Sequence, residues 1–149
     1  MAQFTLSLDP ANGPVLTAFV GVSLARRDAL MTADRPIPAG ATIRAPIDTG
    51  ASNTCVDAGV LGSLGLTPTS SVTVHTPTTG AEAHTAEQYD VSIIVPGTGS
   101  HHAPLVIPAV PVLSASLTRQ GIDALIGRDI LRDRILTYNG SLGMFTLAF

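Results

Sequence analysis

Alternation of apolar and polar residues at both ends of the chain most constrains the fold. The segment "FTLSL" at residues 4–8 has an apolar residue at every second position, and "FTLAF" at residues 145–149 repeats the pattern. A period of two puts alternate side chains on one face, which is typical of a half-buried β-strand and not of a helix. We therefore expect a mainly β protein.

A β-hairpin is predicted in the middle of the chain. Residues 71–75 and 83–95 have strand-like sequences, and they flank the segment "TPTTGAE" at residues 76–82. Gly80 lies near the tip of this connection, where a glycine accommodates the backbone of a tight turn. The other β-rich segments are residues 14–25, 41–47 and 105–113.

Two short segments have sequences compatible with a helix, at residues 52–66 and at residues 127–136. The first is interrupted by glycines, so we expect one late helix, formed by "GRDILRDRIL". Residues 26–40 contain Pro36, Pro38 and Gly40, and this composition predicts a long connection without regular structure. The overall prediction is an all-β domain that spans residues 1–149.

Composition excludes several classes of protein. With 149 residues the chain has the length of one domain, and only 13% of its residues are charged. The net charge of −3 gives no basic surface for nucleic acid or for a membrane. The single cysteine, Cys55, excludes an internal disulfide framework. No signal peptide or membrane-spanning segment is visible, so we expect a cytoplasmic protein, with excision from a longer precursor left open.

An acid lies where an apolar strand enters a turn. Asp48, Thr49 and Gly50 follow the apolar segment "ATIRAPI" directly, and Ala51 and Ser52 come next. Asp and Gly are common turn residues, so this triplet alone is compatible with an ordinary solvated turn. A second motif, "ALIGRDIL" at residues 124–131, opens the late helix with Arg128 and Asp129 in its first turn.

Together, "PIDTGAS" and "ALIGRDIL" resemble the motifs of the retropepsin-like aspartic proteases, the single-domain relatives of the retroviral proteases that include bacterial members. The hairpin lies between the motifs, where that family has its flap. The resemblance covers roughly residues 14–149. It implies a retropepsin-like closed β-barrel with a flap hairpin and one short C-terminal helix, acting as an aspartic endopeptidase without cofactor or metal.

The chemistry of that family requires two carboxyl groups. Two carboxyls about 3 Å apart cannot both ionise, so the pair keeps one proton and offers a base and an acid to the same water and amide. This chain has one Asp-Thr/Ser-Gly triplet. If Asp48 is catalytic, its partner is Asp48 of a second copy, and the enzyme is a homodimer that cleaves a peptide or protein substrate.

The resemblance also assigns roles to the residues around Asp48. Thr49 is expected to hydrogen-bond across the dimer axis, and Gly50 to let the substrate backbone approach. The residues expected to contact an extended substrate are Ala51, Ser52 and Leu125 and, at the hairpin tip, Thr78, Thr79 and Gly80.

One position departs from the family pattern. Viral members usually carry an acid where this chain has Ser52, and that acid pairs with the arginine that corresponds to Arg128. Because a serine cannot form an ion pair, we expect Arg128 to have another partner.

Two further functions remain open. A non-catalytic peptide-binding or dimerisation module on the same fold would not depend on the Asp48 carboxylate. A processing domain cut from a polyprotein would differ from the protease only in its substrate.

Overall fold

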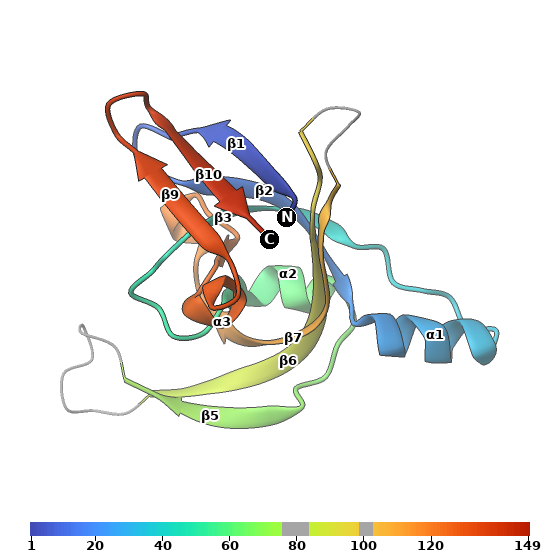
Figure 1. The fold of residues 1–149 in the computed structure, drawn as a ribbon. Coiled ribbons are helices and arrows are strands. Elements are labelled where there is room, and N and C mark those ends of the chain that lie inside the picture. The colour runs from blue at the N-terminus through green and yellow to red at the C-terminus, as the bar shows by residue number, and fades with distance from the viewer. Residues whose placement is uncertain (76–83, 99–102) are drawn as a thin grey trace.

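The computed structural model describes residues 1–75, 84–98 and 103–149, and this part of the chain has a mostly β fold (Figure 1). Its strands form a three-stranded sheet of order β1-β10-β9 and a seven-stranded sheet of order β3-β2-β6-β7-β4-β8, with β5 also paired to β6. The small sheet contains β1 (Gln3–Ser7), β9 (Ile135–Asn139) and β10 (Met144–Ala148). The large sheet contains β2 (Val15–Val22), β3 (Ala41–Pro46), β4 (Cys55–Asp57), β5 (Ser70–Val74), β6 (His84–Val95), β7 (Leu105–Ala115) and β8 (Ala124–Leu125).

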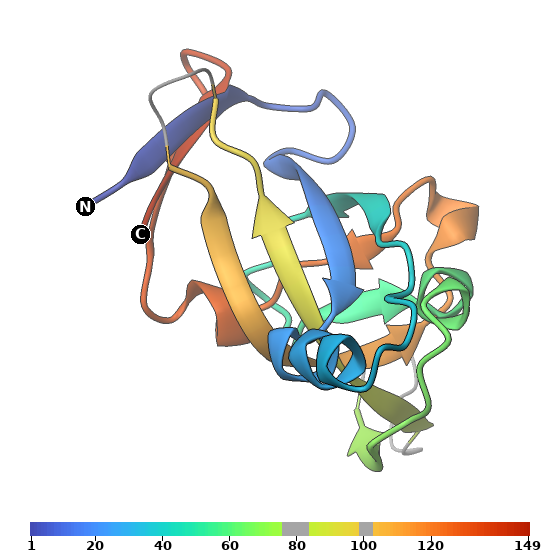
Figure 2. The same ribbon diagram turned by 90° about the vertical axis from the view of Figure 1, so that its right-hand side faces the viewer.

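The large sheet curves until it nearly closes on itself. Strands β6 and β7 pair along most of their lengths, and both bend strongly as they cross the molecule (Figures 1 and 2). A register shift between Val91 and Ile93 lies within this pairing, and such irregularities increase the local bend of a strand. The concave side of the sheet therefore encloses the core.

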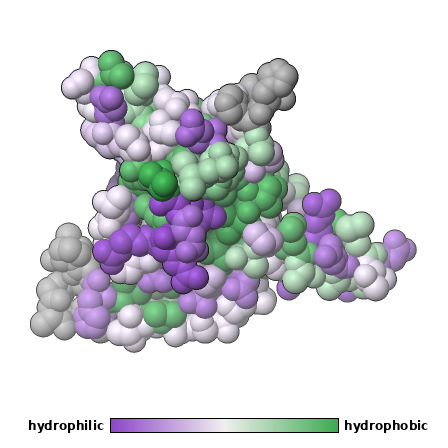
Figure 3. Space-filling model, viewed as in Figure 1, coloured by the Kyte–Doolittle hydropathy of each residue, from purple (hydrophilic) through white to green (hydrophobic). Residues whose placement is uncertain are grey.

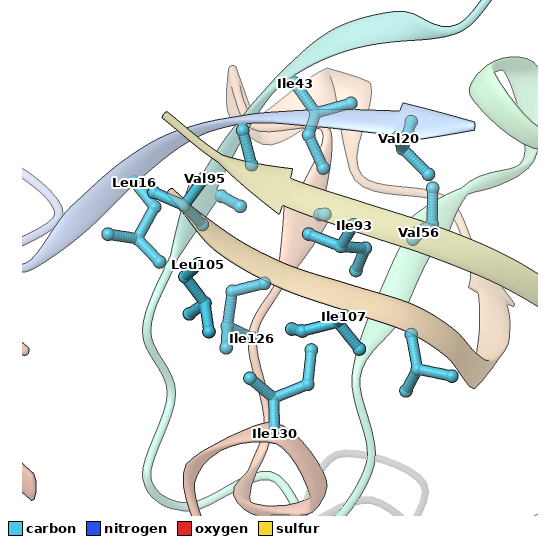
Figure 4. Packing of buried hydrophobic residues seen from close by; sticks show 14 of the residues in the cluster. Leu16, Val20, Ile43, Val56, Ile93, Val95, Leu105, Ile107, Ile126 and Ile130 are labelled. Atoms are coloured by element: carbon cyan, nitrogen blue, oxygen red, sulfur yellow. The ribbon is translucent and has the colours of Figure 1, made fainter. Parts of the chain in front are cut away.

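Apolar side chains from several strands and one helix meet inside this curve. Leu16 and Val20 on β2, Ile93 on β6 and Ile107 on β7 point into the same space (Figure 4). Ile130, on the short helix α3 (Arg128–Leu131), reaches the same cluster from the other side and is 4% exposed. The core therefore fixes the position of α3 relative to the sheet.

The structure corrects the prediction that residues 26–40 lack regular structure. Helix α1 (Leu24–Thr32) occupies the first part of this segment, and Pro36, Pro38 and Gly40 follow its end. The Ser23 hydroxyl accepts a hydrogen bond from the Arg26 N–H at the start of the helix. No residue of α1 is buried, so the helix has no apolar stripe that the sequence could reveal.

The late helix is shorter than predicted. Helix α3 ends at Leu131, and strand β9 begins at Ile135, so residues 135–136 belong to a strand. A turn with a hydrogen bond from the Arg134 N–H to the Leu131 carbonyl separates the two elements. Two more short helical segments are present in the described residues, α2 (Ala58–Ser63), which begins after Asp57, and the 3₁₀ turn η1 (Thr118–Gln120).

The terminal strands pair with each other within one chain. Strands β1 and β10 are antiparallel, with Gln3 opposite Ala148 and Ser7 opposite Met144. Each terminal strand covers one edge of the other, and β1 and β9 are the outer strands of the small sheet.

Among the residues that the structure describes, no helix has both the length and the apolar character needed to cross a membrane.

Candidate active site

Backbone hydrogen bonds to a segment far away in the sequence hold the Asp48 turn in place. The Asp48 N–H donates to the Ile126 carbonyl at 2.9 Å, and the Ile126 N–H donates to the Pro46 carbonyl at 2.9 Å. These bonds join the end of β3 to the segment between β8 and α3. The two sequence motifs, centred on Asp48 and on Gly127, are therefore in direct contact.

The Asp48 carboxylate also stabilises its own turn. Its Oδ1 atom accepts a hydrogen bond of 2.8 Å from the Gly50 N–H. A Cβ atom at Gly50 would lie 3.1 Å from Asp48 Oδ1, so a larger residue would crowd the carboxylate. Asp48 is partly exposed and Thr49 and Gly50 are exposed. The turn therefore presents its carboxylate at the surface of the single chain.

The residues after this turn are attached to the start of α3. The Arg128 N–H donates to the Ala51 carbonyl at 2.9 Å, and the Asp129 N–H donates to the Ser52 carbonyl at 3.2 Å. At Gly127 the two segments touch, because a Cβ atom there would lie 2.5 Å from the carbonyl carbon of Asn53. Only a glycine permits this approach.

A buried hydrogen-bond network completes the attachment. Asp129 accepts bonds from the Thr54 hydroxyl at 2.7 Å and from the Thr54 N–H at 2.9 Å. The Thr54 hydroxyl also accepts a bond of 3.0 Å from the Gly127 N–H, and Thr54 is 0% exposed. Asp129, predicted to lie near the site, therefore acts inside the scaffold and does not face the cleft.

Five of the predicted site residues border one cavity of about 620 Å³. Asp48, Gly50, Ala51, Ser52 and Leu125 belong to its lining, and Thr49 does not. The remaining lining residues are Asn53, Cys55, Val72, Thr73, Val74, His75 and Leu113. The cavity lies between the Asp48 segment and strand β5, and its lining is mostly apolar or uncharged.

The hairpin predicted in the middle of the chain contributes one wall of this cavity. Strands β5 and β6 pair with Val74 opposite His84. Val72, Thr73 and Val74 of β5 and the next residue, His75, line the cavity, a role that sequence reasoning missed. The predicted tip residues Thr78, Thr79 and Gly80 lie outside the described residues.

Arg128 forms a hydrogen bond with Ser52, although we expected it to have another partner. An Arg128 Nη2 hydrogen donates to the Ser52 Oγ atom at 2.8 Å. Arg128 and Ser52 are therefore in contact through a hydrogen bond between a cation and a neutral hydroxyl. The expectation of a different partner for Arg128 is wrong.

Cys55 is partly exposed and lines the cavity. Burial raises the pKa of its thiol, and the negative charges of Asp129 and Asp48 raise it further. The thiol is therefore protonated near neutral pH and behaves as a small apolar wall of the cleft.

Comparison with known proteins supports the fold. No family model matches the chain, and no curated protein sequence matches it. The structure is similar to the crystal structure of a retropepsin-like aspartic protease from Rickettsia conorii, with a TM-score of 0.60 and 15% sequence identity. The match covers 99% of this chain and 90% of that protein. At this identity the similarity shows a shared fold, so the prediction of a mostly β, retropepsin-like fold is confirmed at that level.

Proposed function

We propose that this chain is an aspartic endopeptidase that works as a homodimer, with Asp48 of each copy forming the catalytic pair. One observation carries the proposal. The Asp48 carboxylate borders a largely apolar cavity, at a turn that backbone hydrogen bonds to residues 126–129 hold in position. The fold shared with a retropepsin-like aspartic protease supports it.

In this proposal residues 1–149 are one domain that carries half of an active site. The β5–β6 hairpin serves as the flap, and its tip, with Thr78, Thr79 and Gly80, covers bound substrate. Two such domains meet at their Asp48 turns. Within each domain the curved sheet forms the closed barrel expected of this fold. The short helix α3 near the C-terminus supports the turn from behind.

The reaction needs one ionised and one protonated Asp48. The ionised carboxylate takes a proton from a water molecule, whose oxygen attacks the carbonyl carbon of the scissile peptide bond. The protonated carboxyl donates its proton to the carbonyl oxygen, which gives a tetrahedral diol. The diol then collapses as the C–N bond breaks: the carboxyl that took the water proton protonates the leaving nitrogen, and a diol hydroxyl returns a proton to the other carboxylate. No covalent intermediate and no metal take part.

The neighbours of Asp48 have supporting roles. Thr49 is exposed in the single chain and is free to hydrogen-bond across the dimer axis. Gly50 leaves room for the substrate backbone beside the carboxylate. Ala51, Ser52 and Leu125 contact the side chains of an extended peptide, together with Val72 and Val74 on the opposite wall.

The test is digestion of a proteome-derived peptide library between about pH 4 and pH 7. Wild-type protein should cut between apolar residues, with the highest rate at mildly acidic pH because the pair must keep one proton. Asp48→Asn should abolish cleavage. Asp28→Asn is the matched control, because Asp28 is exposed on α1, away from the cavity, and should cleave like wild type.

Equal cleavage by wild type and Asp48→Asn would contradict the proposal. A folded dimer that binds peptides without cutting them would favour the non-catalytic binding module instead.

A further inference from the structure

Arg128 bonds to the cavity-lining residue Ser52 and forms no ion pair with a carboxylate of the described residues. In the part of the chain that the structure describes, the ion pairs join Arg44 to Asp9 and Arg132 to Asp133. Arg128 is exposed, and its side chain bonds to the Ser52 hydroxyl. Hydrophilic side chains gather over α3 in this region of the surface (Figure 3).

The acid nearest in sequence, Asp129, forms no ion pair with Arg128. Asp129 directs both carboxylate oxygens inward, to Thr54 and to the N–H of Ile130. It is therefore committed to the buried network that joins α3 to the Asp48 segment. Among the residues that line the cavity, Asp48 is the one acid.

The contact with Arg128 determines what the Ser52 hydroxyl can do. A guanidinium group can only donate hydrogen bonds, so Ser52 Oγ accepts the bond of 2.8 Å. The hydroxyl hydrogen remains available, and Ser52 lines the cavity. The cation withdraws electron density from the hydroxyl and strengthens it as a donor. The position therefore offers a donor and a positive charge to whatever lies beside it.

We propose that Arg128 and Ser52 form an anion-recognising subsite at the end of the cleft, which binds the carboxylate of an Asp or Glu side chain of the substrate. The inference rests on the proposed function for its setting, because the peptide is held in the same cleft. An acid in place of Ser52 would give this position the opposite preference, since a carboxylate accepts hydrogen bonds and repels another carboxylate. Substrates are then peptides with apolar residues at the scissile bond and an acidic residue a few positions away.

The test compares pairs of peptides that differ by one isosteric change. A segment with an apolar cleavage site carries Glu at one position, moved stepwise along both sides of the scissile bond, and each peptide has a twin with Gln. The C-termini are amidated, so the Glu side chain supplies the only carboxylate. For one position we expect wild type to cleave the Glu peptide about three- to tenfold faster than its twin at low salt.

Three variants test whether the preference for Glu over Gln depends on Ser52 and Arg128. Ser52→Asp places a carboxylate beside Arg128 and should abolish or reverse the Glu-to-Gln ratio. Arg128→Gln removes the cation and should bring the ratio to about one. Arg132→Gln is the control, because Arg132 is an exposed cation beyond α3 whose partner is Asp133, and the ratio should stay as in wild type. Each ratio is measured within one protein, so a change in overall activity does not affect it.

Binding of the same peptides to Asp48→Asn, measured by fluorescence anisotropy, separates this inference from the proposed function. Tighter binding of a Glu peptide without cleavage by wild type would support the subsite and contradict the protease. Cleavage with equal rates for Glu and Gln at every position, or a preference that survives Arg128→Gln, would overturn the subsite and leave the protease standing. Neither binding nor cleavage would overturn both.

Discussion

The two walls of the cleft are built in different ways. On one side, the segment from Asp48 to Thr54 is joined to residues 126–129 by backbone hydrogen bonds, the partly buried Asp129 carboxylate and a glycine contact. On the other side, strand β5 pairs with β6 alone, and none of its residues is buried. The first wall cannot move without breaking many interactions, whereas the second is held by one ladder of hydrogen bonds.

This difference suits the chemistry proposed for the site. A carboxylate that must meet its counterpart at about 3 Å needs a rigid support, because small errors in position cost much of the rate. A wall that closes over different peptide side chains benefits from fewer fixed contacts. The following substitutions test whether stability is concentrated in the first wall.

The largest effect is expected for Gly127→Ala. The new methyl group would meet the backbone of Asn53 and Thr54 at 2.5 to 2.8 Å, and backbone atoms cannot move aside cheaply. We expect the free energy of unfolding to fall by about 3 kcal/mol, measured by urea denaturation. Gly62→Ala is the control, since a Cβ atom in that helical position meets nothing within 4 Å and should be neutral or slightly stabilising. Equal effects of the two changes would show that the contact at Gly127 is not tight.

Thr54→Val should have the next largest effect. The change keeps the shape of the side chain but removes the hydroxyl that binds Asp129 and the Gly127 N–H. Asp129 keeps its bonds from the Thr54 and Ile130 N–H groups, but the buried Gly127 N–H loses its partner, which should cost about 2 kcal/mol of unfolding free energy. Thr73→Val on the opposite wall is the matched control, because Thr73 is exposed and the change should stay within about 0.5 kcal/mol. A larger loss at Thr73 than at Thr54 would reverse the comparison between the walls.

The stability should depend on pH through Asp57, the last residue of β4 and the N-cap of α2. Burial alone would raise the pKa of its carboxyl, but hydrogen bonds from Leu117, Thr118 and Gly59 outweigh burial and lower the pKa from 3.8 to about 2. The stabilisation is therefore fully present above pH 3.8 and is lost as the pH falls toward about 2.

Unfolding free energies measured across this range should decrease for wild type, and the decrease should be smaller for Asp57→Asn. Identical pH profiles would show that the Asp57 carboxylate is not held as described. Because this stability is lost only at a pH below the mildly acidic range, the protein should remain folded at the pH where the proposed protease is most active.

The smallest effect on stability is expected for Val72→Ala on β5. Val72 is only partly buried and lines the cavity, so the unfolding free energy should change by about 1 kcal/mol or less. Under the proposed function, KM for peptides with large apolar side chains should rise a few fold while kcat changes less. A stability loss as large as that of Thr54→Val would contradict the description of β5 as a lightly held wall.

The strands were the most predictable part of the structure, because alternation is a local signal. Strands β1 and β10 cover most of the segments at residues 4–8 and 145–149, and the two arms of the central hairpin pair with each other. Helix α1 was missed because it buries nothing, and β9 was missed because "RIL" continues the apparent helical pattern of α3.

The contacts between the two motifs could not be derived from the sequence. Thr54 and Gly127 lie next to the predicted residues in the sequence. Only the structure shows that their segments meet and that the Thr54 hydroxyl accepts a hydrogen bond from the Gly127 N–H. The hydrogen bond from Arg128 to Ser52 was missed because we looked for an ion pair, and a neutral hydroxyl also satisfies a guanidinium. Motifs identified which residues belong together, and the structure shows which atoms hold them.

The central claim is that one active site requires Asp48 from two copies. Wild type and Asp48→Asn are mixed in equal amounts, unfolded and refolded together so that chains pair at random, and assayed at constant total protein. If both Asp48 carboxylates are needed, the mixture should retain about one quarter of the wild-type rate, since about one quarter of the pairs contain two wild-type chains. A rate of about one half would mean that each chain acts alone and would contradict the account.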